Sequence, residues 1–227
     1  MKSNRILIMA VLLLTGFTAK AQYQNGDRIG EFYFGFNAVA PLGEFNKEAA
    51  PIEKGYPFLP LDADHIGSSA KWGIGLSFKY SFKFNIVEDK ASAGPFVGID
   101  LTWNSLDKKV NKAFNDLKCD KPHYINIPLM IGANGRYYFN DVLGVSAEFG
   151  IGLDMLYITP QGWSDKKEKY GVDFSMAWQI GAGIYLGQHV NIGLHYYSFG
   201  LHNTTEDDAK KYTKSISALM FKLGFCW

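Results

Sequence analysis

The feature that most constrains this chain is a strict alternation of apolar with polar or small residues over residues 70–84. The even positions carry the apolar set, which is Ala70, Trp72, Ile74, Leu76, Phe78, Tyr80, Phe82 and Phe84. The odd positions carry the polar or small set, which is Lys71, Gly73, Gly75, Ser77, Lys79, Ser81 and Lys83. Successive side chains of a β-strand point to opposite faces. The pattern therefore predicts one long strand with an apolar face and a polar face.

The same two-residue period returns in seven further segments. They lie at residues 32–38, 97–103, 125–132, 145–155, 174–184, 190–197 and 219–227. The connections are alternately long, at residues 40–69, 104–122, 159–171 and 201–213, and short, at about residues 85–92, 140–142 and 187–189. Short turns at one end and long loops at the other are typical of outer-membrane barrels. We predict an all-β fold, a closed antiparallel up-and-down transmembrane β-barrel of about eight strands, with ten left open.

The first residues have the three-part order of a secretory signal peptide. A basic start precedes an apolar run at residues 6–14, and small residues follow at Ala19-Lys20-Ala21. The apolar run is too short for a membrane-spanning helix, which takes roughly 20 residues. We predict a signal peptide at residues 1–21 and an outer-membrane β-barrel domain at residues 22–227, exported to the bacterial outer membrane.

Charge and cysteine content argue against several other classes of protein. The chain has 23 Lys and Arg against 22 Asp and Glu, so we expect no nucleic-acid partner. Cys119 falls in a predicted loop and Cys226 in the last predicted strand, so a disulfide between them is not expected. Neither cysteine lies beside the predicted cleavage point, where a lipid anchor would need one.

The direction of the apolar face separates a membrane barrel from a soluble ligand-binding barrel, which buries its apolar face inside. Here the polar face is rich in glycine and carries charges of both signs, as a narrow filled lumen requires. We predict that these charged side chains form a polar network in the lumen. They are Lys71, Lys79, Lys83, Asp100, Arg136, Glu148, Asp154, Asp173 and Lys222.

Aromatic residues gather near the predicted strand ends, where they suit the two membrane interfaces. They are Trp72, Phe82, Phe84, Trp103, Tyr137, Tyr138, Phe139, Tyr157 and Trp227. The last alternating segment ends with Phe225 and Trp227. An aromatic residue at that place resembles the signal read by the barrel assembly machinery, which we therefore expect as a partner, with outer-membrane lipid as the other.

Three segments carry a resemblance to a known family. They are Tyr124-Ile125-Asn126-Ile127-Pro128-Leu129, Tyr137-Tyr138-Phe139 and Tyr197-Ser198-Phe199-Gly200-Leu201-His202-Asn203. With these segments the chain resembles the PorT-like outer-membrane β-barrel family over roughly residues 30–227. The position of Asn126 is often acidic in that family. The resemblance implies the fold and location of a small barrel like OmpA or OmpX, and it implies no activity.

The residues indicate no cofactor, no metal site and no enzyme. Glycine pairs such as Gly73 and Gly75 lie inside predicted strands and lead into no helix, so they do not form a phosphate loop. No pair of histidines has zinc-ligand spacing on one element. An envelope lipid-modifying enzyme could use His195 and Ser198, but their spacing of three puts them on opposite faces of a regular strand.

Prolines and lysines mark the loops. Pro41, Pro51, Pro57 and Pro60, together with Phe58 and Leu59, make the first long loop the best candidate for an exposed binding surface. Pro128 lies inside a predicted strand and predicts a bulge there. The second long loop is basic, with an anionic envelope polymer as a conceivable partner, and its lysines are Lys108, Lys109, Lys112, Lys118 and Lys121.

From these observations we expect a monomeric barrel with a lumen filled by side chains. Its role would be structural in the envelope, or interactive through an extracellular partner at the long loops. The alternative is a porin-like narrow channel or transporter for small solutes. The sequence leaves open the ligand, the partner and whether the lumen conducts.

Overall fold

The computed structural model describes residues 30–46, 70–87, 90–116, 118, 120–159, 161–163, 166–168, 172–203 and 213–227. The predicted signal peptide at residues 1–21 lies outside the described residues. So do Pro51, Pro57, Phe58, Leu59, Pro60 and Cys119 of the predicted loops.

Eight long strands form the wall of the described part of the chain. They are β1 (Gly30–Leu42), β2 (Ala70–Phe82), β4 (Ala91–Leu106), β5 (Tyr124–Tyr138), β6 (Leu143–Ile158), β9 (Val172–Leu186), β10 (Val190–Asn203) and β11 (Thr213–Cys226). A short strand, β3 (Phe84–Val87), follows β2 after a break at Lys83 and pairs with β4. β7 (Gln161–Trp163) and β8 (Lys166–Glu168) form a separate two-stranded sheet.

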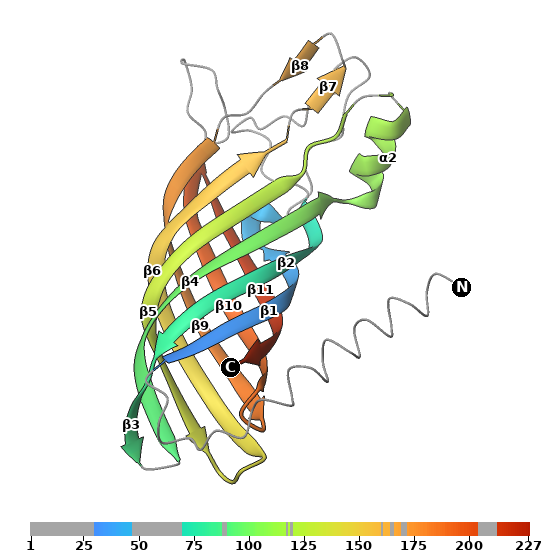
Figure 1. The fold of residues 1–227 in the computed structure, drawn as a ribbon. Helices are drawn as coiled ribbons and strands as arrows, with labels where there is room; N and C mark the ends of the chain where they lie inside the picture. Colours follow the sequence, from blue (N-terminus) through green and yellow to red (C-terminus); the bar gives the residue numbers. More distant parts are fainter. Residues whose placement is uncertain are drawn as a thin grey trace, which may run out of the picture.

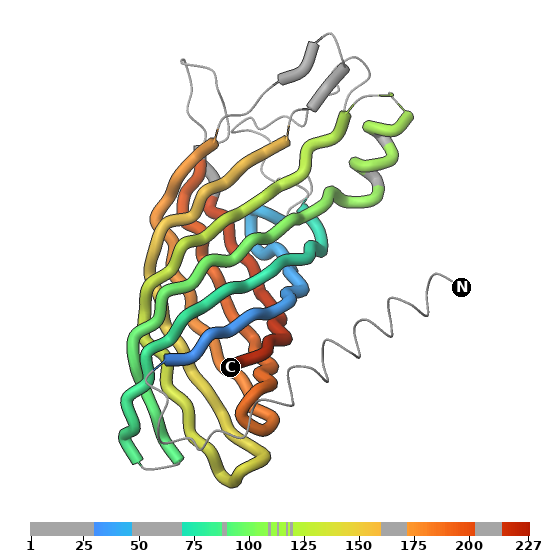
Figure 2. Tube along the Cα trace, viewed as in Figure 1, coloured from blue at the N-terminus to red at the C-terminus, as the bar shows by residue number. Residues whose placement is uncertain are grey.

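The eight strands close into a ring. Each pairs antiparallel with the next in the order β1, β2, β4, β5, β6, β9, β10, β11, and β11 pairs with β1 again, with Phe34 opposite Phe225. The strands run steeply tilted around one axis (Figure 1, Figure 2). A closed ring leaves no free strand edge along the wall, which is the condition for strands to cross lipid. The predicted closed antiparallel barrel of about eight strands is confirmed.

Side chains of the ring alternate between the outside and the lumen. On β9, Phe174 and Met176 are 64% and 66% exposed, whereas Ala177 and Gln179 are 3% and 2% exposed. The outward set is apolar, and its largest members include Trp72, Ile74, Leu129, Ile131, Phe149, Ile180, Leu194 and Phe221. Exposed apolar surface costs about 25 cal/mol per Å² in water. The wall is therefore suited to lipid, because large apolar side chains of the described strands point outward.

Aromatic side chains lie outward near both ends of the barrel. Trp72 and Trp103 lie towards the long-loop end, and Phe82, Phe84, Tyr137, Phe139 and Trp227 towards the short-turn end. Tyr138 was expected among them, but it is 5% exposed and faces the lumen. The reason is strand parity, because Tyr138 shares its face of β5 with Arg136 and not with Tyr137.

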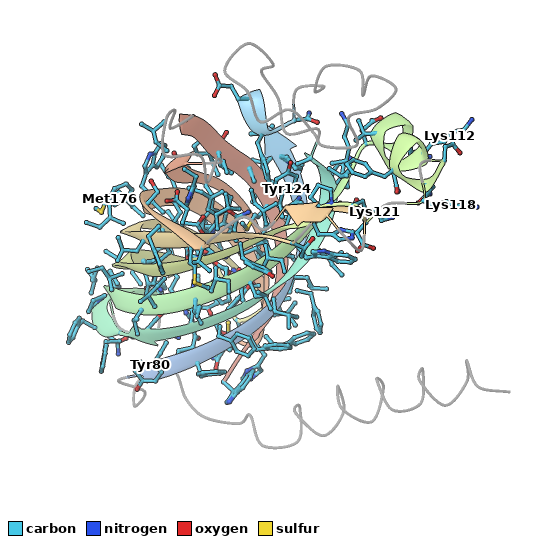
Figure 3. The ribbon with its side chains drawn as sticks, turned by 90° about the horizontal axis from the view of Figure 1, so that it is seen from above. Tyr80, Lys112, Lys118, Lys121, Tyr124 and Met176 are labelled. Carbon is cyan, nitrogen blue, oxygen red and sulfur yellow. The ribbon has the colours of Figure 1, made fainter. Side chains whose placement is uncertain are left out.

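The two ends of the barrel differ. Short turns join β3 to β4, β5 to β6 and β9 to β10, and β1 begins and β11 ends at this short-turn end. The opposite, long-loop end carries a 3-10 turn η1 (Gly43–Phe45) and a helix α2 (Lys108–Asp116). Viewed along the barrel, α2 lies beside the wall and not over the lumen (Figure 3). No helix in the described ranges is long and apolar enough to cross a membrane.

The prediction of a bulge at Pro128 is wrong. Pro128 lies opposite Asp154 in an uninterrupted register between β5 and β6. On the other side of β5, its pairing with β4 is interrupted around Pro128. Ile99 pairs with Leu129 before the interruption and Thr102 with Asn126 after it, and the register is the same in both places. Proline lacks the N–H that a ladder bond needs. It therefore removes pairing locally without inserting an extra residue.

A β-bulge lies instead on β10, and it corrects the predicted strand end. The sequence predicts a loop from residue 201, whereas β10 continues to Asn203 with a register shift between Ser198 and Gly200. Gly200 has a φ of 82°, and a Cβ there would stand 2.2 Å from the Met176 carbonyl oxygen. The extra residue reverses the alternation beyond it, so His202 points into the lumen and is 0% exposed.

Candidate functional site in the barrel lumen

The mouth cluster lies at the short-turn end and consists of Glu31, Lys83, Arg136, Tyr138 and Tyr185. Arg136 donates to both carboxylate oxygens of Glu31, with 2.8 Å from Nη1 to Oε2. Lys83 Nζ also donates to Glu31 Oε2. Arg136 Nη2 donates to the Tyr185 hydroxyl at 3.0 Å, and its guanidinium lies 4.4 Å from the Tyr185 ring centroid. A bidentate and stacked guanidinium is held in one orientation.

The first central cluster joins strands that face each other across the lumen. Lys79 Nζ donates to Glu148 Oε2, and Gln179 Nε2 donates to Glu148 Oε1 at 3.3 Å. His195 Nδ1 lies 3.1 Å from Glu148 Oε1, close enough for an ion pair although not aligned for a hydrogen bond. The Lys79 ammonium also lies 4.9 Å from the ring centroid of Tyr33. The carboxylate thus has donors from β2 and β9, and the His195 imidazole of β10 lies beside it.

The second central cluster surrounds Asp100. Lys222 Nζ donates to Asp100 Oδ1 at 2.8 Å, and the Tyr197 hydroxyl donates to Oδ2 at 2.6 Å. The Ser77 hydroxyl also donates to Oδ1, and Lys222 Nζ lies 2.8 Å from the Tyr197 hydroxyl oxygen. Both Lys222 and Asp100 are 5% exposed. Charges buried this far need matched partners, which this cluster supplies.

A histidine lies between two carboxylates nearer the long-loop end. His202 Nδ1 is hydrogen-bonded to Asp173 Oδ2 at 3.0 Å. His202 Nε2 lies 3.0 Å from Asp154 Oδ2, at ion-pair distance but without hydrogen-bond alignment. Asp154 and His202 are both 0% exposed. This cluster links β6, β9 and β10 inside the lumen.

An apolar plug fills the long-loop half of the lumen. Its members are Val39, Phe45, Leu106, Tyr124, Leu156, Ile158, Phe199 and Ile216, and they belong to one buried cluster with Phe114 of α2 beside the wall. Phe45 comes from η1 and Phe114 from α2, so the connections contribute side chains as well as the strands. The Phe45 and Tyr124 rings meet edge to face with centroids 5.2 Å apart.

Adjoining pockets occupy the short-turn half. The pocket at the mouth shares Arg136 with a second pocket deeper in the lumen. That second pocket shares Lys79, Glu148, Asn191 and His195 with a third around the central clusters. Small pockets in the described lumen therefore extend from the short-turn mouth to the level of Asp100 and Lys222, between the paired charges.

The predicted network residues fall into separate groups. Lys83 and Arg136 lie in the mouth cluster, and Asp154 and Asp173 meet at His202. Lys79, Glu148, Asp100 and Lys222 lie in the central clusters. Lys71 lies apart at the long-loop rim, where its Nζ is 3.0 Å from Asn46 Oδ1 and 3.8 Å from Asp107 Oδ2.

Sequence reasoning missed several members of these clusters. Glu31 precedes the first clear alternation, so nothing marked it as a strand residue of the lumen. Tyr197 and Tyr185 carry no charge and are not among the predicted network residues, although each hydroxyl hydrogen-bonds to a buried charge. The sequence predicts a loop at His202, because the alternation of apolar and polar residues does not reveal a bulge. The Gly200 beside it was the available signal.

The histidine and serine considered for catalysis lie on opposite faces of β10. His195 faces the lumen and Ser198 the other face of β10, because the bulge begins only after Ser198. Cys226 is a free, buried thiol. Among the described side chains, no three of His, Cys, Asp and Glu are placed to hold a metal ion. Phe225 and Trp227 face outward, and the Trp227 ring lies 5.0 Å from that of Phe32, while their role in assembly stays a prediction.

The basic second loop contains α2. Val110 and Phe114 pack inward, whereas Lys112 and Lys118 are exposed and lie outside the wall in Figure 3. Lys121 Nζ donates to Asn111 Oδ1 at 2.8 Å. Partial burial, with the ammonium of Lys121 nearby, lowers the pKa of His123 from its usual value. Lys112 and Lys118 are therefore available to solvent or lipid at the long-loop end.

Comparisons with known proteins give only distant likenesses. No family model and no curated protein matches the chain, so the resemblance to PorT-like proteins stays a prediction. Among solved structures, the attachment invasion locus protein Ail of Yersinia pestis is 13% identical with a TM-score of 0.44, covering 87% of this chain and 97% of that one.

Two further barrels are similar to this chain. Neisserial surface protein A is 12% identical with a TM-score of 0.41, covering 86% of this chain and 95% of that one. The N-terminal β-barrel domain of Pseudomonas aeruginosa OprF is 13% identical with a TM-score of 0.37, covering 91% of this chain and all of that one. At such scores, the assignment of a barrel rests on the strand register of this chain itself.

Proposed function

We propose that the protein is a bacterial outer-membrane barrel that serves the envelope through its wall and its long-loop end, and not by passing solutes. The observation that carries the proposal is the filled lumen. Paired charges cross it in its short-turn half, and the apolar plug fills its long-loop half. A barrel of eight strands has an interior just wide enough for side chains to fill.

The outer surface supports the membrane location. Side chains such as Trp72, Ile74 and Met176, at 70%, 64% and 66% exposed, would be costly in water over a whole wall. Aromatic side chains lie near both ends of this wall, as they do at lipid interfaces. The long-loop end would face outward, so that η1, α2 and the lysines of its loop meet an extracellular partner or the outer leaflet.

Two measurements test this proposal together. The membrane-extracted protein is run unheated and boiled in SDS, and the refolded protein is added to planar bilayers. We expect a mobility shift on boiling and no conductance steps above the bilayer background. A soluble protein without a shift contradicts the location, and regular conductance steps contradict the filled lumen.

A narrow channel is the second candidate, and the chain of pockets from the mouth to Asp100 favours it. Conductance from the wild-type protein would establish it. A lipid-modifying activity is a third hypothesis, and it requires that Ser198→Ala abolish acyl hydrolysis of an envelope lipid. His195 and Ser198 lie on opposite faces of β10, so the serine and its base would not meet, which counts against this activity.

A further inference from the structure

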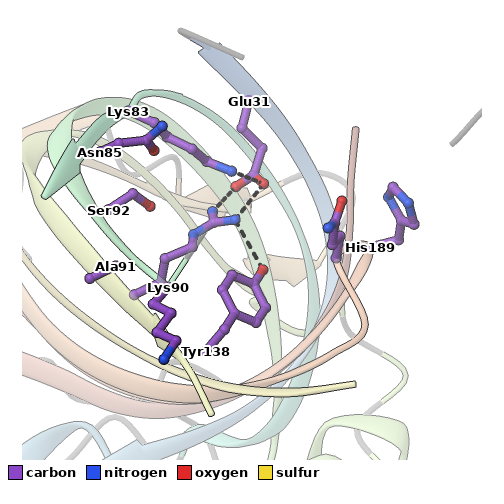
Figure 4. Close-up of a pocket in the computed structure, with 10 residues that line it drawn as sticks. Glu31, Lys83, Asn85, Lys90, Ala91, Ser92, Tyr138 and His189 are labelled. Atoms are coloured by element: carbon purple, nitrogen blue, oxygen red, sulfur yellow. Dashed lines mark hydrogen bonds and ion pairs between the residues drawn. The ribbon is translucent and has the colours of Figure 1, made fainter. Parts of the chain in front are cut away.

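The pocket at the short-turn mouth is lined by more positive than negative side chains (Figure 4). Lys83, Lys90 and Arg136 contribute three positive charges, and Glu31 contributes the negative charge among the lining residues. Glu31 is neutralised by its two cationic neighbours, as the dashed lines in Figure 4 indicate. The lining therefore keeps an excess of positive charge after its own ion pairs are formed.

Hydrogen-bond capacity shows which cations are free to bind. A guanidinium has five N–H groups, and Arg136 uses four contacts on Glu31, Tyr138 and Tyr185. Most of the Arg136 donors are thus used by residues of the pocket wall. Lys83 has three donors, and among the described residues it uses them only on Glu31. Its remaining donors are available to a ligand in the pocket.

The rim of this pocket carries further hydrogen-bond donors, on β3, on β4 and on the turn between them. The exposed Lys90 side chain makes no hydrogen bond or ion pair with another described residue, while its backbone joins β3 and β5. The Ser92 hydroxyl and the Asn85 amide line the same pocket. Two ammonium groups with a hydroxyl and an amide are donors suited to phosphate or carboxylate oxygens.

We propose that this pocket binds an oxyanion, a phosphate or carboxylate group, between Lys83 and Lys90. Ser92 and Asn85 complete the donor set. The Arg136 and Glu31 pair is the positioning element, because it holds Lys83 at the mouth while four of the five Arg136 N–H groups are already used. This site is separate from the proposed role of the wall and the long loops, and it would serve a ligand that reaches the short-turn end.

The test is a titration of the full barrel, in uncharged detergent, with inorganic phosphate and in a second series with acetate. Binding is followed by calorimetry or by NMR of labelled lysine. We expect saturable binding that is about tenfold weaker in Lys83→Gln and in Lys90→Gln, because each loses one charge-assisted hydrogen bond. Lys112→Gln makes the same charge change on α2 and should bind as the wild type does.

The salt dependence separates a charged site from a general effect of added solute. Raising the ionic strength from about 0.01 M to about 1 M shortens the Debye length from about 30 Å to about 3 Å. Phosphate binding should then weaken steeply. Binding that ignores salt, is lost equally in Lys112→Gln, or is absent altogether overturns the proposal.

Two further arms make the result unambiguous. The boiled and unheated gel shows whether each variant is folded, and the rim variant Lys90→Gln keeps the test valid even where Lys83→Gln does not fold. Nanodiscs of neutral lipid, with and without phosphatidylglycerol, distinguish the sources of phosphate. Competition by the anionic lipid assigns the site to a headgroup, whereas unchanged binding assigns it to a soluble anion.

Discussion

The two halves of the lumen are filled by different chemistry. In the short-turn half, Glu31, Asp100 and Glu148 are each held by cations from other strands, and pockets lie between the clusters. In the long-loop half, apolar side chains from six strands and η1 meet around Leu156 and Phe199, and His202 with its two carboxylates lies beside them. Directed polar contacts predominate in one half, and close apolar packing predominates in the other.

The two kinds of contact have different effects on the barrel: ion pairs fix which strand positions meet, and apolar packing closes the lumen. An ion pair across the lumen holds two strands at one register, but it needs every partner to stay in place because an unpaired buried charge is very costly. A packed apolar cluster keeps water out but tolerates small changes of shape. We therefore expect the two halves to fail differently when single side chains are removed.

The largest effect is expected for Arg136→Met in the mouth cluster. Glu31 would keep only Lys83, and breaking a buried pair costs about 4 kcal/mol of unfolding free energy. Urea unfolding of the barrel in micelles measures the loss. The triple variant Glu31→Gln with Lys83→Met and Arg136→Met should recover part of it, since neither a carboxylate nor an ammonium of this cluster is then left buried without its partner. Equal stability of the single and triple variants would contradict this account.

Phe199→Ala should come next and should change a second property. Phe199 is 0% exposed and stacks on Tyr197, so its loss opens a cavity and costs about 3 kcal/mol. It also thins the plug, and we expect water or small ions to leak through in planar bilayers. The control is Phe174→Ala on β9, where the side chain is 64% exposed and no cavity forms.

Gly200→Ala tests the bulge that turns His202 into the lumen. A side chain at a φ of 82°, against the Met176 carbonyl oxygen, should cost about 2 kcal/mol. Gly187→Ala is the matched control, because its φ is 62° but a Cβ there meets nothing within 4 Å. Similar unfolding free energies for the two variants would mean that the close approach is unimportant.

The smallest effect is expected for Lys71→Gln at the long-loop rim. Its side chain is 33% exposed and lies 3.8 Å from Asp107, so its loss should cost at most about 1 kcal/mol. The same urea unfolding measurement applies. A loss as large as that of Arg136→Met would show that the rim pair belongs to the lumen network after all.

The alternation of side chains by itself determined the fold class. Over residues 70–84, and again in seven segments, a period of two separates an apolar face from a polar face with no tertiary information. The alternating loop lengths then indicated an up-and-down barrel and its two ends. The charged residues of the lumen face could be named for the same reason, since the period assigns a face to every residue of a regular strand.

Only the tertiary structure decided which lumen residues meet. A period of two gives the face but neither the height of a side chain in the barrel nor the strand opposite it. Glu31 and Arg136 are 105 residues apart, and Asp100 and Lys222 are 122 apart, and these contacts depend on ring closure and strand tilt. His202 needed in addition the bulge at Gly200, because one extra residue reverses the faces beyond it.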